Sequence, residues 1–158
     1  MLTKPSLLSM KRLGDVAVGA IVARNGGVEG GLAIRLADQA GRTFVLHLIH
    51  QWELRCTTWD PADPVMVLVE PEDVLLELGE ERELPTNMAG VLGVHLGGAY
   101  LNALDEQGIR PRRLDLRTWD IAARGNVDDV KTYSSWAIGN LDSDRKFKRV
   151  YGFTSQAR

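Results

Sequence analysis

Two histidines separated by two residues, His47 and His50, are the first candidates for chemistry in this chain. On a helix they would share one face with Glu53, as metal ligands require, whereas on a strand they would point to opposite faces. We expect a strand here, and no third strong ligand stands nearby, so no metal or other cofactor is predicted. With Asp60 and Asp63 the histidines define one alternative function, a small enzyme, which requires all four side chains in one cleft.

Cys56 is the single cysteine in the sequence. It follows Trp52 and Leu54 in an alternating apolar pattern, where a thiol is usually an unreactive part of the core. One cysteine excludes an internal disulfide, and the N-terminal residues lack the pattern of a secretion signal, so we expect a cytoplasmic protein. The sequence also contains no glycine-rich phosphate-binding motif of either common type.

The segment from Asp144 to Phe153 interleaves cations with aromatic residues. Its candidate binding residues are Arg145, Lys146, Lys148, Arg149, Tyr151 and Phe153, and Arg110, Arg112 and Arg113 could extend the same positive surface. Cations that hold phosphates beside aromatic rings that stack on bases are typical of nucleic-acid binding, which is the second alternative function. An edge strand whose aromatic residues enter the core would give the same pattern.

Charge is unevenly distributed along the chain although the net charge is only −2. Residues 60–83 contain nine acidic residues and one basic residue, whereas residues 108–158 contain eleven basic and six acidic residues. Surfaces of opposite sign on one chain favour contact with another protein or with a second copy of the same chain. We therefore predict that the partner is another protein or a second copy of the chain in a homo-oligomer, with nucleic acid as the second choice, and we predict no membrane association.

Several segments alternate between apolar and polar residues, as half-buried strands do. We expect a buried strand from Val16 to Ala23, a hairpin joining 32–36 to 44–48, strands at 65–69 and 74–78, and a last strand near 147–153. Pro71 to Asp73 can form a single helical turn.

Residues 43–59 fit two structures. Phe44, Leu46 and Leu48 alternate in the manner of a strand, but Val45, Ile49 and Trp52 also repeat at helical spacing, so a helix stays open. The sequence from Glu53 to Ala62 shares five residues of ten with that from Arg113 to Ala122, which would suit a duplicated strand pair.

The longest apolar segment runs from Thr86 to Gln107. Met88, Leu92 and Leu96 recur at helical spacing, Thr86 could cap the first turn, and Gly108 could end the last one. The pattern predicts one long buried helix, too short and too polar at its centre to span a membrane. A second, shorter helix is predicted from Val127 to Ile138.

These patterns together predict a single α+β domain over residues 1–158, with a mainly antiparallel sheet packed against the long helix. No catalytic constellation is evident. The leading prediction is therefore a non-catalytic protein-binding module, such as a small accessory, inhibitor, immunity or assembly protein, which acts through its segregated acidic and basic surfaces.

Overall fold

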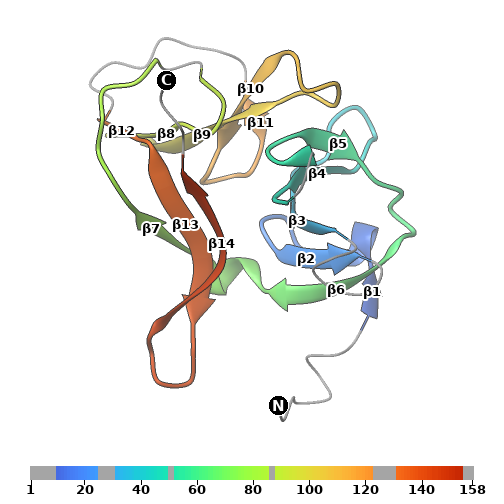
Figure 1. Ribbon diagram of the computed structural model, residues 1–158. Coiled ribbons are helices and arrows are strands. Elements are labelled where there is room, and N and C mark those ends of the chain that lie inside the picture. Colours follow the sequence, from blue (N-terminus) through green and yellow to red (C-terminus); the bar gives the residue numbers. More distant parts are fainter. Residues whose placement is uncertain (1–9, 25–30, 50–51, 86–87, 123–130, 155–158) are drawn as a thin grey trace.

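Antiparallel strands make up nearly all of the regular secondary structure in a computed structural model of the protein (Figure 1). The structure describes residues 10–24, 31–49, 52–85, 88–122 and 131–154. No helix of seven residues or more occurs in these ranges, so the α+β prediction is wrong and the chain is mainly β. Within the same ranges, no helix has the length and apolar character that crossing a membrane requires.

The first sheet has six strands in the order β1-β6-β2-β3-β4-β5. These are β1 (Met10–Arg12), β2 (Ile21–Arg24), β3 (Leu32–Arg35), β4 (Phe44–His47), β5 (Cys56–Thr58) and β6 (Pro64–Val69), with a 3-10 turn, η2, at Leu13–Asp15. The predicted hairpin is confirmed by the register of β3 on β4, in which Ile34 lies opposite Leu46. Only Ile21 to Arg24 of the first predicted strand is extended in the sheet, since Gly19, at φ +92°, turns the chain just before it.

The described part of residues 43–59 contains the strands β4 and β5 and not the alternative long helix, while residues 50 and 51 lie outside the described residues. β4 and β5 pair with each other as an antiparallel hairpin, with Leu46 opposite Cys56. The similarity of residues 53–62 to residues 113–122 does not carry over into structure, because β5 corresponds in that alignment to the turn at residues 116–118.

The second sheet has five strands in the order β11-β10-β9-β8-β12, and the third has three in the order β14-β13-β7. Their bounds are β7 (Leu75–Leu78), β8 (Leu92–His95), β9 (Gly98–Leu104), β10 (Pro111–Asp115), β11 (Ile121–Ala122), β12 (Lys131–Tyr133), β13 (Ser135–Leu141) and β14 (Phe147–Thr154). A second 3-10 turn, η5 (Pro71–Asp73), joins β6 to β7 and confirms the predicted helical turn.

The long helix predicted from Thr86 to Gln107 is wrong over its described part, residues 88–107, which contains the hairpin of β8 and β9, with His95 paired to Gly98 around the turn Leu96–Gly97. Residues 86 and 87 lie outside the described residues. Leu96, expected in the core, is fully exposed. The glycines explain the difference. A Cβ atom on Gly93 would lie 2.3 Å from Cζ of Tyr100, and one on Gly90 would lie 2.1 Å from Cζ of Phe153. Each glycine thus makes room for an aromatic ring between strands, which the sequence pattern did not distinguish from helix packing.

The predicted second helix, Val127 to Ile138, is also wrong over its described part. Residues 131–133 and 135–138 belong to β12 and β13, while residues 127–130 lie outside the described residues. Trp136 and Ile138 point into the core, and Thr132 Oγ1 donates a hydrogen bond to the carbonyl of Arg82. β-branched and aromatic side chains here favour the extended chain over the helix.

The three sheets meet at one large apolar core. It takes residues from all of them, including Ile21, Ile34, Leu46, Leu101, Leu114, Trp136 and Ile138. A second cluster covers the other face of the six-stranded sheet, with Leu13, Val22, Val45, Trp59 and Val65 among its members. Strand residues of β3 and β4 alternate between the two clusters, so this sheet is buried on both faces.

Candidate functional site

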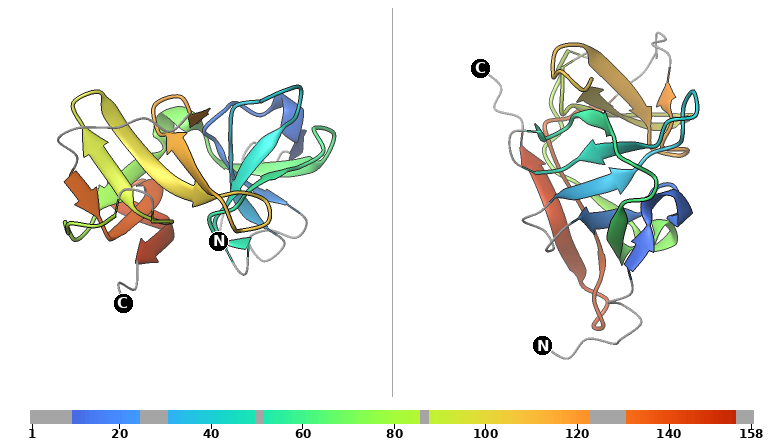
Figure 2. Two further views of the ribbon diagram at one scale, coloured as in Figure 1. Left: turned by 90° about the horizontal axis from the view of Figure 1, so that it is seen from above. Right: turned by 90° about the vertical axis from the view of Figure 1, so that its right-hand side faces the viewer.

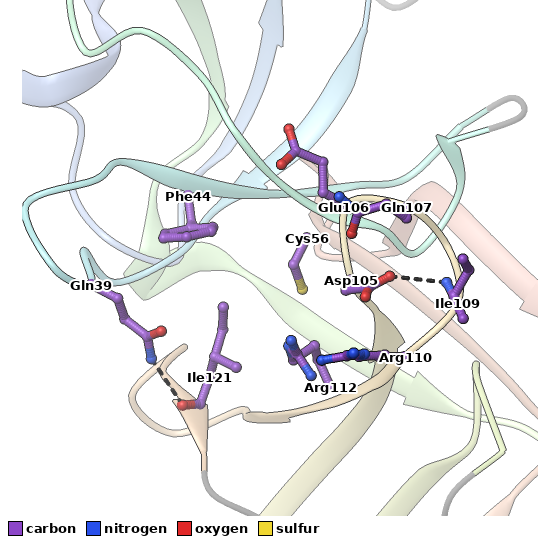
Figure 3. Close-up of a pocket in the computed structure, with 10 residues that line it drawn as sticks. All are labelled: Gln39, Phe44, Cys56, Asp105, Glu106, Gln107, Ile109, Arg110, Arg112 and Ile121. Carbon is purple, nitrogen blue, oxygen red and sulfur yellow. Dashed lines mark hydrogen bonds between the residues drawn. The ribbon is translucent and has the colours of Figure 1, made fainter.

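A cavity of about 550 Å3 lies where the six-stranded sheet meets the turn between β9 and β10 (Figure 3). The cavity walls come from β4, β5, β10, β11 and two turns. The lining residues are Gln39, Phe44, Cys56, Asp105, Glu106, Gln107, Ile109, Arg110, Arg112 and Ile121.

Hydrogen bonds join the two sheets on both sides of this cavity. On one side the Leu104 N–H donates to the Leu54 carbonyl at 2.8 Å. On the other side Gln39 Nε2 donates to the Ile121 carbonyl at 3.0 Å, and the Ala37 N–H donates to the Trp119 carbonyl at 3.1 Å. The walls are therefore held in place by hydrogen bonds to three backbone carbonyl groups, two from backbone N–H groups and one from a side chain.

Asp105 shapes the turn that forms one wall. Its Oδ1 accepts the Ile109 N–H at 2.9 Å, its carbonyl accepts the Gly108 N–H, and its own N–H donates to the Arg110 carbonyl. The hydrogen bond from the Ile109 N–H is the largest cause of the lowered pKa of the Asp105 carboxyl group. The backbone N–H of Arg110 and the positive charge of Arg112 lower this pKa further. Asp105 is thus an ionised turn cap at neutral pH.

Two of the arginines that the sequence singled out, Arg110 and Arg112, line the same cavity. Within the described residues neither guanidinium has a carboxylate oxygen within 4.0 Å. Arg113, the third, lies apart from them, with its guanidinium carbon 4.3 Å from the centre of the Tyr100 ring. The cavity therefore holds two cations whose charge no close ion pair neutralises.

Cys56 is buried at the cavity wall. Burial raises the pKa of its thiol to about 12, while Arg112 acts weakly in the opposite direction. The thiol is therefore protonated at neutral pH, in keeping with the unreactive core role that its alternating neighbours predicted.

His47 lies away from this cavity, beside two tryptophans on the six-stranded sheet. Its Nε2 is 2.7 Å from Thr57 Oγ1, and its ring centre is 5.3 Å from that of Trp59. Burial, followed by the charges of Arg24 and Arg55, lowers the His47 pKa to about 4, so the ring is neutral at pH 7.

The carboxylates of the enzyme alternative have other contacts. Asp63 forms an ion pair with Arg24 at 3.6 Å, and Asp60 Oδ1 accepts the Ala62 N–H at 2.8 Å. His50 lies outside the described residues. Among the described residues, no group of three or more His, Cys, Asp or Glu side chains is placed to hold a metal ion.

The basic segment lies on a hairpin arm, which we define as β13, β14 and the turn between them. Arg145, Lys146, Lys148 and Arg149 are exposed on it, but Tyr151 is buried, and its ring centre is 5.8 Å from that of Trp136. Phe153 is half-buried and stacks on the same tryptophan at 5.7 Å. The two aromatic rings that would stack on bases therefore belong to the core.

The predicted positive surface is divided between two ends of the molecule. The turn of the hairpin arm lies at the bottom of the molecule in Figure 1 and in the right-hand view of Figure 2. Strand β10, which holds Arg112 and Arg113, lies at the top in both views. The four cations of the arm and the three arginines near β10 thus form separate sites.

The sequence did not single out one exposed region, the outer edge formed by residues 75–84. All four residues of β7 are exposed. After β7 the chain continues beside the start of β13 and then beside β12. The Gly79 N–H donates a hydrogen bond to the Ser135 carbonyl, and the Arg82 N–H donates one to the Thr132 carbonyl. Glu77, Glu80, Glu81 and Glu83 lie on this acidic edge. Its one signal in the sequence was the acidic composition of residues 60–83, which was assigned to partner binding as a region and without naming these residues.

Comparison of the chain with protein families, with curated proteins and with solved structures finds no match to any of them.

Proposed function

We propose that this chain is a non-catalytic protein-binding module whose partner is a second copy of itself, joined through the acidic edge of one copy and the hairpin arm of the other. The observation that carries the proposal is the opposite composition of these two surfaces on one three-stranded sheet. The acidic edge is residues 75–84, and the arm bears Arg145, Lys146, Lys148 and Arg149.

The acidic edge is suited to add a strand. β7 is the outermost strand of its sheet within the described residues, so its outer backbone groups have no strand beside them. Leu75, Leu76 and Leu78 are 39%, 36% and 42% exposed, an unusual density of apolar surface for an edge. Addition of an extended segment would cover these side chains and pair the free backbone.

The hairpin arm offers a matching surface. β7 begins opposite Gly139, whereas β13 and β14 remain paired as far as Leu141 opposite Phe147, so the arm extends beyond its neighbour (Figure 2). Leu141, at its end, is 48% exposed beside the four exposed cations. Apolar contact between leucines would provide most of the affinity, and charge would choose the partner and its orientation.

One ion pair within the sheet indicates how the two surfaces would match. Glu77 and Arg149 approach to 3.7 Å across β13, in which Glu77 lies opposite Ala137 and Arg149 lies opposite Gly139, two residues further along the strand. The same pair of residue types can form between copies. Like charges would oppose contact between two acidic edges or two arms, so the favoured contact is heterologous and leads to a ring or an open row.

Light scattering coupled to size-exclusion chromatography tests this proposal with two charge-reversed variants. The edge variant carries Glu77→Lys, Glu80→Lys and Glu81→Lys, and the arm variant carries Lys146→Glu, Lys148→Glu and Arg149→Glu. We expect the natural chain to associate, each variant alone to associate at least tenfold more weakly, and an equimolar mixture of the two to recover association, since opposite charges again face each other.

A control variant, Arg117→Gln, removes an exposed cation that belongs to neither surface and should associate normally. A natural chain that stays monomeric at high concentration would contradict the proposal, and so would a mixture that fails to recover. A single-stranded oligonucleotide added in parallel should leave the elution unchanged. A monomer that shifts only with oligonucleotide would replace the proposal with nucleic-acid binding.

A further inference from the structure

We propose that the cavity between the six-stranded sheet and the β9–β10 turn binds a small organic anion. The carboxylate or phosphate of the ligand would lie on Arg110 and Arg112, and its flat apolar body would lie against Phe44 and Ile121 (Figure 3). This site is separate from the two self-association surfaces and does not depend on them.

The two arginines provide the reason for a negative ligand. They are two residues apart, one in the turn and one in β10, and both reach the same cavity. Within the described residues neither has an ion pair inside 4.0 Å, and the one hydrogen bond that either side chain donates runs from Arg112 Nη1 to the Pro111 carbonyl at 3.3 Å. Most of their N–H groups are thus left for a carboxylate or phosphate, which a guanidinium binds in a bidentate geometry.

Within the described residues, the two acidic residues of the cavity form no close ion pair with the arginines. Asp105 is ionised and its charge interacts with that of Arg112 over a longer distance, while its Oδ1 accepts the Ile109 N–H as part of the turn. Glu106 is exposed, and Figure 3 shows it on the opposite side of Cys56 from both arginines. This separation of charge would orient a ligand with its anionic end toward the arginines and its uncharged end away from them.

The remaining walls suit a flat, partly apolar molecule. The Phe44 ring and the Ile121 side chain lie on one side of the cavity in Figure 3. Gln39 uses its Nε2 to donate a hydrogen bond to the Ile121 carbonyl. The amide oxygen of Gln39, Oε1, is not used in that bond and can accept a hydrogen bond from an N–H or O–H of the ligand. A volume of about 550 Å3 is in the range of small-molecule sites, and Phe44, Ile109 and Ile121 supply apolar wall beside the six polar residues of the lining.

Titration calorimetry with the full-length chain tests the inference with three probes. Sodium benzoate supplies a carboxylate on a ring, adenosine monophosphate supplies a phosphate on a larger flat body, and inorganic phosphate supplies the charge alone. We expect saturable binding of benzoate or adenosine monophosphate and much weaker binding of inorganic phosphate. Whichever organic probe binds more tightly identifies the anionic group that the site prefers.

Arg112→Gln and Arg110→Gln should each weaken the preferred probe by about 10- to 100-fold, as the loss of a charged hydrogen bond does. Arg117→Gln is the matched control, because Arg117 is exposed in the next turn and pairs with Asp115 at 3.8 Å. Arg110 is exposed, so its variant should keep the fold even if the Arg112 variant loses stability.

The backbone amides of Cys56 and Phe44 supply a second, local measurement, because both residues line the cavity. A bound probe should shift their NMR resonances in a titration of the natural chain but not of Arg110→Gln. Absence of saturable binding by both organic probes would overturn the inference. So would inorganic phosphate binding as tightly as they do, or an affinity unchanged in both arginine variants.

Discussion

The six-stranded and three-stranded sheets are built from similar strands but bury them differently. In the first, β3 and β4 send alternate side chains into two apolar clusters, Ile34 and Leu46 to the large core and Ala33 and Val45 to the smaller one. In the third sheet, Trp136 and Ile138 reach the core, but the adjoining β7 is exposed along its whole length. The difference indicates that the first sheet supports the fold, while the third has surface left for a partner.

The largest effect that would test this division comes from shortening one leucine in each sheet. Leu46→Ala removes a side chain with no exposed surface, and we expect the free energy of unfolding to fall by about 2–5 kcal/mol. Leu76→Ala, in β7, should cost less than about 1 kcal/mol because that side chain is already 36% exposed. Urea unfolding followed by fluorescence measures both values. Equal losses would show that β7 also supports the fold.

A glycine in the hairpin arm sharpens the comparison. A Cβ atom on Gly139 would lie 2.0 Å from the backbone carbonyl oxygen of Lys148, so Gly139→Ala must push β13 and β14 apart at their irregular register. We expect a loss of about 1–3 kcal/mol. Hydrogen exchange should rise in the arm and remain slow in the six-stranded sheet.

Gly152→Ala is the matched control in the same arm. Its added Cβ would meet only the side chain of Arg149, with the nearest atom at 3.0 Å, and that flexible chain can move aside. Faster exchange throughout β3 and β4 in Gly139→Ala would contradict the proposed independence of the arm.

The strands of the six-stranded sheet could largely be predicted from sequence. The hairpin of β3 and β4 and the strand β6 show alternation or a short apolar run between turn residues, which are local signals. Even there the helix alternative for residues 43–59 was excluded only by the pairing of Leu46 with Cys56, a contact that periodicity does not contain.

Residues 88–107 show why the rest could not be predicted. Tyr100, Leu101, Asn102 and Ala103 are all buried, so β9 has no polar face and no alternation. A strand buried on both faces gives the same apolar run as a buried helix. Gly93 favours the strand over the helix, because its missing side chain leaves space for the ring of Tyr100, its partner in the adjacent strand. The sequence pattern does not contain this contact between two strands.

The candidate sites were predicted in part. Arg110 and Arg112 were named from their charge, but they were grouped with the basic arm because sequence gives no distance between separate hairpins. The other walls of the cavity, such as Phe44 and Ile121, come from separate segments and left no local signal. The acidic edge was visible as composition, whereas its free strand edge follows only from the sheet order.

The smaller of the two stability effects expected in the six-stranded sheet, after that of Leu46→Ala, concerns the titration of His47. Its pKa of about 4 in the folded chain lies below its ordinary value of 6.5, so the unfolded chain takes up the proton first as pH falls. Stability should therefore be unaffected above pH 6.5 and should decrease between pH 6.5 and 4, by about 1–2 kcal/mol for a partly exposed ring.

Urea midpoints of the natural chain and of His47→Gln, measured at pH 7 and pH 4.5, check this. His47→Gln should lose less stability on acidification, because glutamine does not titrate. Parallel pH profiles would mean that the protonated ring is accommodated in the folded chain, and that burial of the six-stranded sheet beside Trp59 is looser than its contacts indicate.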